Sequence, residues 1–197
     1  MVRLLILGML KIKPLSGYEI QQVLQTSQTE IWAGILPGSI YHALKKMDKE
    51  GLVEIDSVEQ TGHRIKAIYR ITDKGRAEFP QLLQESLREK SIGLPSTLYA
   101  AISFLHELPR EDQIQALKQQ KDLLEHELEQ LKSGQKVKEQ YVTLNAIAKL
   151  QFENMYAHYQ LQIDFIEKLV YQIENNDEED TTITSEQFQK YFNHDPE

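Results

Sequence analysis

Two short stretches of the sequence combine basic residues with side chains that can hydrogen-bond a phosphate. Residues 39–49 hold Ser39, Tyr41 and His42 together with three lysines, and residues 60–66 read Gln-Thr-Gly-His-Arg-Ile-Lys. Lysine and arginine neutralise phosphates, while hydroxyl, imidazole and amide groups bond phosphate oxygens or base edges. Binding of a nucleic acid is therefore the chemistry that these residue types could perform.

The charge of the chain is distributed unevenly. The net charge is −8, yet residues 1–80 carry 11 basic and 9 acidic residues, a net of +2, and residues 81–197 carry 11 and 21, a net of −10. Such asymmetry is typical of a chain in which one segment faces a polyanion and another faces water or protein. The solubility of acidic helices explains it equally well.

The sequence also predicts the elements that position residues 39–49. Residues 2–10 are apolar on nearly all sides, as in a buried helix, and Pro14 follows them. Ser16 and Glu19 match a capping box, in which both side chains satisfy free N–H groups at a helix start. A second helix should therefore run to about residue 26, with a loop over residues 32–37.

Gly38-Ser39 can cap a third helix, which should run to Glu50 because Gly51 suits the left-handed conformation that terminates helices. Helical spacing turns four apolar residues inward: Ile40, Ala43, Leu44 and Met47. It leaves five residues on the outer face: Tyr41, His42, Lys45, Lys46 and Lys49. From residue 52 the apolar period changes to every second residue, which predicts a hairpin with Gly62 in its turn. Three helices followed by a hairpin are the winged-helix plan.

Four segments in this order resemble the PadR-like family of transcriptional regulators. They are Leu5-Ile6-Leu7-Gly8, then Leu15-Ser16-Gly17-Tyr18-Glu19-Ile20, then Tyr41-His42-Ala43-Leu44 ending in Glu50-Gly51-Leu52-Val53, and finally Tyr69-Arg70-Ile71-Thr72-Asp73-Lys74-Gly75-Arg76. The resemblance covers residues 2 to about 78. The chain departs from the family pattern at Met47-Asp48, where Leu-Glu is more common, and at Pro80.

The second part of the chain has helical patterns throughout. Thr72-Asp73 can start a helix in which Pro80 predicts a kink or a late start. A linker at residues 93–96 precedes a helix that Ser96 caps and that runs to about residue 108. Heptad positions then follow from residue 114 to 131, with the single polar core position at Lys121.

We predict that Ser133-Gly134 interrupts this helix and that one long helix spans residues 137–173, about 55 Å at 1.5 Å per residue. A second apolar stripe widens its surface: Leu150, Ala157, Leu161, Phe165 and Leu169. One partner helix cannot cover both stripes, so we expect contact with another subunit. This part resembles the virulence-activator-type C-terminal domain of the larger PadR-like subgroup.

The resemblance implies a two-fold dimer that binds a palindromic operator as a repressor or an activator, and some family members sense small aromatic molecules such as phenolic acids. We expect a mainly α fold with a small β-hairpin. Residues 1–92 should form a winged-helix DNA-binding domain, residues 93–175 a coiled-coil-like dimerisation domain, and residues 176–197 an acidic, flexible tail.

The expected partners are double-stranded DNA and a second copy of the chain. The predicted DNA-binding residues are Ser39, Tyr41, His42, Lys45, Lys46, His63, Arg64 and Lys66, with Lys45 as the candidate for a guanine contact. The predicted dimerisation residues are Leu117, Leu124, Leu128, Leu131, Tyr141, Leu144, Phe152, Met155, Tyr159, Ile163, Ile166 and Val170.

Several of these residues have a second interpretation. The lysines of residues 45–49 could form a solvated helix face, and Tyr41 could belong to the core. Trp32 could stack on a ligand or anchor the core. The group Met155, Tyr156, His158 and Tyr159 could line a pocket for an unknown small aromatic effector or form dimer core. Asp122, His126 and Glu129 share a helix face, which fits an exposed charged stripe better than an incomplete metal site.

Other classes of protein fit the sequence less well. It has no cysteine, no phosphate loop and no metal-ligand spacing, so we expect no enzyme, no metal and no cofactor. Because no apolar stretch reaches the roughly 20 residues of a membrane span, we expect a cytoplasmic protein without membrane contact. The alternative function is a winged-helix module for protein partners with a helical scaffold arm; a short, uncharged wing would favour it.

Overall fold

The computed structural model describes residues 1–61 and 64–175, and at residues 61, 64 and 65 it describes the backbone alone. Contacts divide the chain into two compact units. The N-terminal unit comprises residues 1–92 and 127–155, and the C-terminal unit comprises residues 93–126 together with the chain from residue 156. The predicted acidic tail and the wing residue His63 lie outside the described residues.

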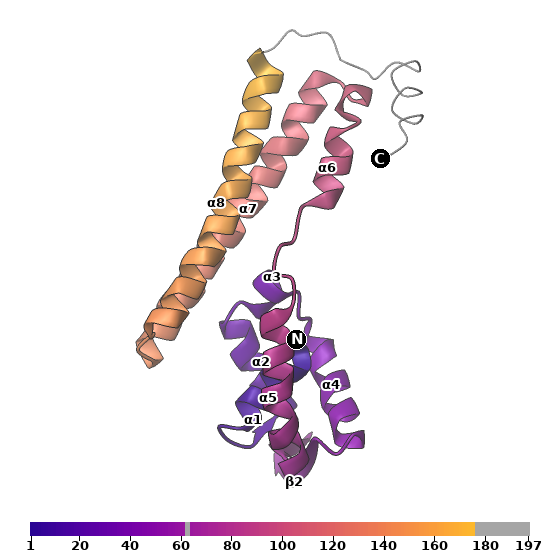
Figure 1. Ribbon diagram of the computed structural model, residues 1–197, viewed down its shortest axis with the longest axis vertical. Helices are drawn as coiled ribbons and strands as arrows, with labels where there is room; N and C mark the ends of the chain where they lie inside the picture. Colours follow the sequence, from indigo (N-terminus) through magenta and orange to yellow (C-terminus); the bar gives the residue numbers. More distant parts are fainter. Residues whose placement is uncertain (62–63, 176–197) are drawn as a thin grey trace, which may run out of the picture. The chain divides into compact units, whose positions relative to one another are not determined.

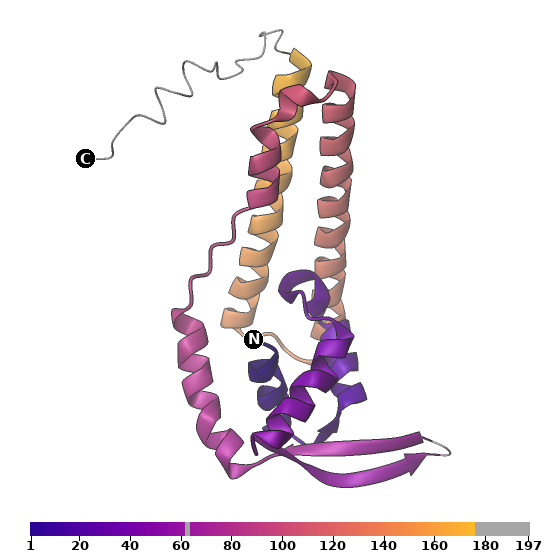
Figure 2. The same ribbon diagram turned by 90° about the vertical axis from the view of Figure 1, so that its right-hand side faces the viewer.

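Five helices and three strands lead from the N-terminus to residue 88 (Figure 1). They are α1 (Val2–Leu10), β1 (Leu15–Ser16), α2 (Gly17–Thr26), α3 (Thr29–Ala33), α4 (Pro37–Lys49), β2 (Val53–Thr61), β3 (Arg64–Ile71) and α5 (Asp73–Arg88). The strands form an antiparallel sheet in the order β1-β3-β2. Strands β2 and β3 make a long hairpin (Figure 2), with an irregularity in register between Ile55 and Ser57. The predicted winged-helix order is therefore present.

A single apolar core joins these elements. Its members come from α1, α2, α4 and the sheet, and the most buried are Ile6, Leu7, Ile20, Ile40, Leu44, Met47, Leu52 and Val53. Helix α1 contributes Ile6, Leu7 and Leu10, as its apolar sequence predicted. Burial of these side chains removes apolar surface from water and holds α4 on α1 and α2.

Local signals fixed several element boundaries correctly. The hydroxyl of Ser16 accepts the N–H of Glu19, and the carboxylate of Glu19 accepts the N–H of Ser16 at 2.8 Å, so the capping box is formed. Gly51 has a φ of 72°, in the left-handed region, directly after α4. The hydroxyl of Thr72 accepts the N–H of Gly75 and caps α5.

Two predictions around α4 were wrong. The helix begins at Pro37 and its N-cap is Leu36, so Ser39 is the third helical residue and not the cap. Proline suits a first position because its missing N–H has no helical partner there. Trp32 belongs to the short helix α3 and not to a loop. The residue before α3, Gln28, has a φ of 52°, which few non-glycine residues adopt and which no sequence signal marked.

Helix α5 does not start late at Pro80; it runs from Asp73 to Arg88 with the proline inside it. Pro80 cannot donate to the carbonyl of Arg76, four residues earlier. Both residues are exposed, so water can satisfy that carbonyl. The next predicted helix, from Ser96, is shorter than expected. It consists of α6 (Ser96–Ile102), with Pro95 as its N-cap, and is followed by the short 3-10 helix η1 (Leu105–Glu107).

The boundary between the two long helices was also wrong. Helix α7 (Arg110–Tyr141) continues through Ser133-Gly134, and α8 (Ala146–Asn175) begins only after residue 145. A Cβ added to Gly134 would lie 2.9 Å from Cγ of Gln28, so this buried glycine gives room to a neighbour instead of ending the helix. The side chain of Asn145 accepts the N–H of Ala148 at 2.9 Å and caps α8.

Helices α7 and α8 lie side by side (Figures 1 and 2), and in the C-terminal unit they share an apolar core around Leu117, Ile166 and Val170. Lys121, the predicted polar core position, lies at the edge of this core. Its ammonium is 2.7 Å from Glu167 and 3.6 Å from Glu125, and these two carboxylates raise the pKa of the lysine. Within the described ranges no helix is both long and apolar enough to cross a membrane, and no cluster of metal ligands occurs.

Candidate nucleic-acid interface

Helix α4 presents a basic face to solvent. Ile40, Leu44 and Met47 are each 1% exposed and hold the opposite face in the core. The outer face carries Tyr41, His42, Lys45, Lys46 and Lys49, all of them exposed. His42 and the three lysines line one shallow hollow in the surface. The structure therefore brings together most of the predicted DNA-binding residues on one helix.

The N-terminal half of α4 crosses α2 at a glycine. A Cβ added to Gly17 would lie 2.7 Å from Cε1 of Tyr41 and 3.3 Å from Cδ1 of Leu44. Only a residue without a side chain allows this approach, which explains why glycine follows the cap residue Ser16. One side of the Tyr41 ring therefore packs on α2, and half of its surface stays exposed.

Ser39 is less available than its position suggests. Its hydroxyl donates to the carbonyl of Leu36 at 2.6 Å, within the first turn of α4. A phosphate oxygen can only accept a hydrogen bond, and in this conformation the Ser39 proton is already used. Contact with a phosphate would require the hydroxyl to rotate.

The basic residues in the described part of the wing are paired with acids. The ammonium of Lys66 lies 3.3 Å from the carboxylate of Glu19 and 3.7 Å from that of Glu59. Arg70 contacts Glu54 at 2.8 Å and Asp56 at 3.4 Å. Of the predicted wing contacts, Lys66 is thus engaged within the protein, His63 lies outside the described residues, and Arg64 is described only by its backbone in β3.

Glu19 remains ionised over the whole physiological range. The hydroxyl of Ser16 donates to its carboxylate, as does the backbone N–H of Ser16, and these bonds together with Lys66 lower the pKa of Glu19 from 4.5 to about 2. One partner of Lys66 is therefore charged at neutral pH. This ion pair links the third residue of β3 to the start of α2.

The predicted dimerisation residues are mostly covered within one chain. Seven of the twelve are buried: Leu117, Leu128, Leu131, Leu144, Ile163, Ile166 and Val170. Leu124, Phe152, Met155 and Tyr159 are half-buried, and Tyr141 is exposed at the end of α7. A different stripe of α8 is open to solvent, with Ile147, Leu150 and Leu161 each more than 60% exposed.

The residues predicted as an effector pocket lie at two separate hollows. Met155 lines a hollow of the N-terminal unit together with Trp32, Phe152 and Lys138. His158 and Tyr159 line another, in the C-terminal unit, with Leu94, Leu124 and Gln162. The indole N–H of Trp32 donates to the carbonyl of Ser27 at 3.1 Å, which fits its interpretation as an anchor.

Comparison with protein families places these elements in a known group. Residues 6–81 match the family model described as the transcriptional regulator PadR-like family. The chain carries a PadR-like domain. The match begins in α1 and ends in α5, so it includes α4 and the whole hairpin. The resemblance expected from the sequence is confirmed, and the PadR-like family is one of transcriptional regulators and not of enzymes.

Solved structures share the fold over most of the chain. The PadR-like transcriptional regulator BC1756 from Bacillus cereus is 24% identical, and the match covers 87% of this chain and 94% of that chain at a TM-score of 0.69. Bacillus subtilis PadR in complex with operator DNA is 21% identical, covering 87% and 96% at 0.68. In complex with p-coumaric acid it is 20% identical, covering 89% and 96% at 0.64. The predicted fold class is confirmed. Among curated proteins, none matches the sequence.

Two features of the site escaped sequence analysis. The pairing of Lys66 with Glu59 depends on the register of β2 and β3, in which these residues are directly opposite. The pairing with Glu19 depends on the approach of α2 to the wing. The sequence held a simple signal only for the pair of Glu59 and Lys66. These two residues lie on either side of the predicted turn, so a hairpin brings them opposite each other.

Proposed function

We propose that this chain is a cytoplasmic, sequence-specific DNA-binding transcriptional repressor that binds a palindromic operator as a homodimer. The observation that carries the proposal is the exposed face of α4. Lys45, Lys46 and Lys49 make no ion pair with a described residue, and they lie on the third long helix of a PadR-like domain. A helix with such a face fits the major groove, where lysine can contact guanine O6 and N7.

The roles within the interface follow from position. Lys45 is proposed to contact a base edge, and Lys46 and His42 to contact bases or phosphates beside it. Tyr41 and Ser39 near the start of α4 are proposed to position the helix on the backbone. At the wing, His63 and Arg64 are proposed to reach phosphates or the minor groove. Lys66 joins them only if DNA competes with Glu19 and Glu59.

A palindromic operator needs two copies of the domain. Helix α8 carries exposed Ile147, Leu150, Asn154, Ala157 and Leu161, which are separated by three and four residues in turn. This is the heptad spacing of a coiled-coil seam, and a polar residue such as Asn154 within it can fix register and orientation. We propose that this stripe pairs with a second copy.

Substitution of Leu161 by lysine tests the dimer. A charge at this apolar position of the seam should convert the dimer to a monomer, measured by sedimentation velocity. Gln160→Lys adds the same charge one residue away from the stripe and should leave the dimer intact. A wild-type monomer, or a Leu161→Lys variant that still sediments as a dimer, would reject this seam.

An effector is a further part of the proposal. Bacillus subtilis PadR has been solved with p-coumaric acid. In this chain, the hollow of the C-terminal unit combines apolar Leu94 and Leu124 with polar His158 and Gln162, a lining that suits a small aromatic molecule with one polar end. Addition of p-coumaric acid to the protein–DNA complex should release DNA if this compound class is the effector. Unchanged affinity at millimolar concentrations would exclude that compound.

Selection of DNA from a random-sequence pool tests the main proposal. The full chain should enrich duplexes that contain an inverted repeat with half-site centres about one helical turn, roughly 34 Å, or a multiple apart. Fluorescence anisotropy at two salt concentrations should then show tight, salt-dependent binding that survives random competitor DNA. Failure to enrich any sequence, with binding no tighter than to random duplex, would contradict the proposal.

One observation favours a second function. The described cations of the wing, Lys66 and Arg70, are neutralised by acids. A wing with little free positive charge also fits a winged helix that binds protein. In that case neither the selected pool nor random DNA would bind in a salt-dependent way.

A further inference from the structure

The C-terminal end of α4 lies at a junction of three helices. The helix ends in a tight turn, in which the N–H of Gly51 donates to the carbonyl of Asp48 and the N–H of Leu52 to the carbonyl of Met47, both at 2.9 Å. The chain then enters β2. The carbonyl groups of Glu50, Gly51 and Leu52 lie beyond the last helical residue of α4, so other elements must satisfy them.

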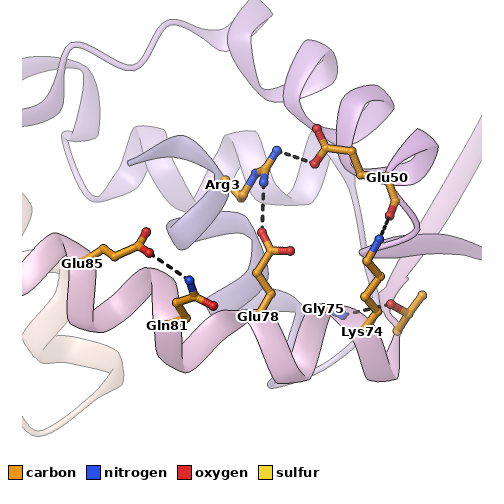
Figure 3. A network of polar contacts seen from close by, with 8 residues as sticks. Arg3, Glu50, Lys74, Gly75, Glu78, Gln81 and Glu85 are labelled. Atoms are coloured by element: carbon orange, nitrogen blue, oxygen red, sulfur yellow. Dashed lines mark hydrogen bonds and ion pairs between the residues drawn. The ribbon is translucent and has the colours of Figure 1, made fainter.

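The start of α5 and its N-cap supply these partners. The ammonium of Lys74 donates to the carbonyl of Glu50 at 2.7 Å (Figure 3). The hydroxyl of Thr72 donates to the carbonyl of Gly51 at 2.7 Å. The N–H of Thr72 donates to the carbonyl of Leu52 at 3.1 Å. The approach is so close that a Cβ on Gly75 would lie 2.2 Å from the carbonyl oxygen of Leu52. These hydrogen bonds therefore hold the start of α5 against the end of α4.

Helix α1 joins the same junction through one side chain. The guanidinium of Arg3 donates to the carboxylate of Glu50, and its other nitrogen donates to the carboxylate of Glu78 at 3.0 Å (Figure 3). The three side chains are about one-third exposed or less. Arg3 thus connects α1, α4 and α5, and Glu50 is held both by its side chain and by its carbonyl.

We propose that Arg3, Glu50 and Glu78 form a clamp that sets the angle of α4 for reading bases, and that they act as positioning residues for sequence recognition. The inference rests on the proposed DNA-binding function. Base contacts require side chains within a fraction of an ångström of the productive geometry, whereas phosphate contacts tolerate displacement. A change in the angle of α4 displaces the side chains along its outer face, among them His42 and Lys45.

The sign of the effect separates the clamp from simple electrostatics. Glu50 and Glu78 are negative, so their neutralisation should strengthen binding to a polyanion if charge alone matters. The clamp requires the opposite for a specific site, because loss of either carboxylate breaks the connection of Arg3 to α4 or to α5. Specific binding should therefore weaken although the domain becomes more positive.

The test compares Glu50→Gln, Glu78→Gln and Arg3→Met with the wild type. Glu85→Gln is the matched control, because Glu85 lies on α5 and is bonded only to Gln81 within this network (Figure 3). The probes are the duplex that wild-type protein selects from a random-sequence pool and one unselected duplex. We expect each clamp variant to lose about fivefold to tenfold in affinity for the selected duplex. Affinity for the unselected duplex should be equal or slightly higher in the two glutamate variants, and equal or slightly lower in Arg3→Met, which loses a positive charge. Glu85→Gln should not weaken either one.

Stoichiometric titration gives the active fraction of each variant, so a purely structural defect appears as fewer active molecules with unchanged dissociation constants. Arg3→Lys, which keeps the charge but has one ammonium for two carboxylates, should lie between wild type and Arg3→Met. If the wild type selects a duplex and all clamp variants bind it as wild type does, the clamp is refuted. If the wild type selects no duplex, the proposed function has failed instead.

Discussion

The exposed lysines of α4 and the basic residues of the wing carry the same charge in different surroundings. Lys45, Lys46 and Lys49 have no acidic partner among the described residues, whereas Lys66 and Arg70 each lie close to two carboxylates. A paired cation must lose its partner before it can contact a phosphate, so its net gain on DNA is small. Two basic segments that look alike in the sequence are thus unequal in what they can bind.

Removal of Lys45 should have the largest effect on DNA. A lysine contact to a guanine is worth about 1–3 kcal/mol of discrimination, so Lys45→Ala should lose about tenfold to a hundredfold on the selected duplex and relax preference at one base pair. Anisotropy titration of single-base operator variants measures this. Lys149→Ala removes an exposed lysine of α8 and serves as the control. Identical base preference in Lys45→Ala and wild type would exclude Lys45 as a base reader.

Removal of Arg64 at the wing should act differently. Arg64→Ala is expected to weaken all sequences alike and to lower the slope of log affinity against log salt by about one, because one phosphate contact is lost. Titrations at several salt concentrations, with selected and random duplex, give both quantities. A loss confined to the selected duplex would mean that Arg64 reads sequence.

Removal of an acidic partner of Lys66 should make this wing lysine more available to DNA, as the lysines of α4 are. Glu59→Gln removes one of its two partners and should raise affinity for random duplex about twofold, since Glu19 still competes for the ammonium. Gln60→Glu, the reverse change at the neighbouring position, should lower that affinity. If Glu59→Gln leaves binding to random duplex unchanged, the pairing in the wing does not limit its contact with DNA.

The smallest effect concerns pH. The folded pKa of Glu19 is about 2 and the ordinary value is 4.5, so this carboxylate stabilises the fold above about pH 4.5 and loses that contribution as the pH falls toward 2. Urea unfolding of wild type and Glu19→Gln should therefore differ most at pH 6 and clearly less at pH 3, and the two should converge only near pH 2. A difference that is the same at both pH values would show that the charge of Glu19 is not responsible.

Local signals accounted for much of the fold. The capping box at Ser16, the left-handed Gly51 and the cap at Thr72 each act within four residues, and each was predicted correctly. The basic face of α4 followed from helical spacing alone, because its inner residues are strictly apolar.

Two of the errors share one cause, which is that the deciding contact is distant in sequence. Gly134 was taken as a helix breaker, but its buried position is set by the approach of Gln28. Lys66 was taken as free, but its partners come from α2 and from the opposite strand. The start of α8 was missed although Asn145, a good capping residue, was visible in the sequence.

Lysine acetylation of the wild-type protein, with and without the selected duplex, tests the difference between α4 and the wing most directly. Mass spectrometry reports the reactivity of each lysine under both conditions. We predict that DNA strongly protects Lys45, Lys46 and Lys49, while Lys66 changes little and Lys149 not at all. Equal reactivity of the α4 lysines with and without DNA, or protection of Lys66 greater than theirs, would contradict the account.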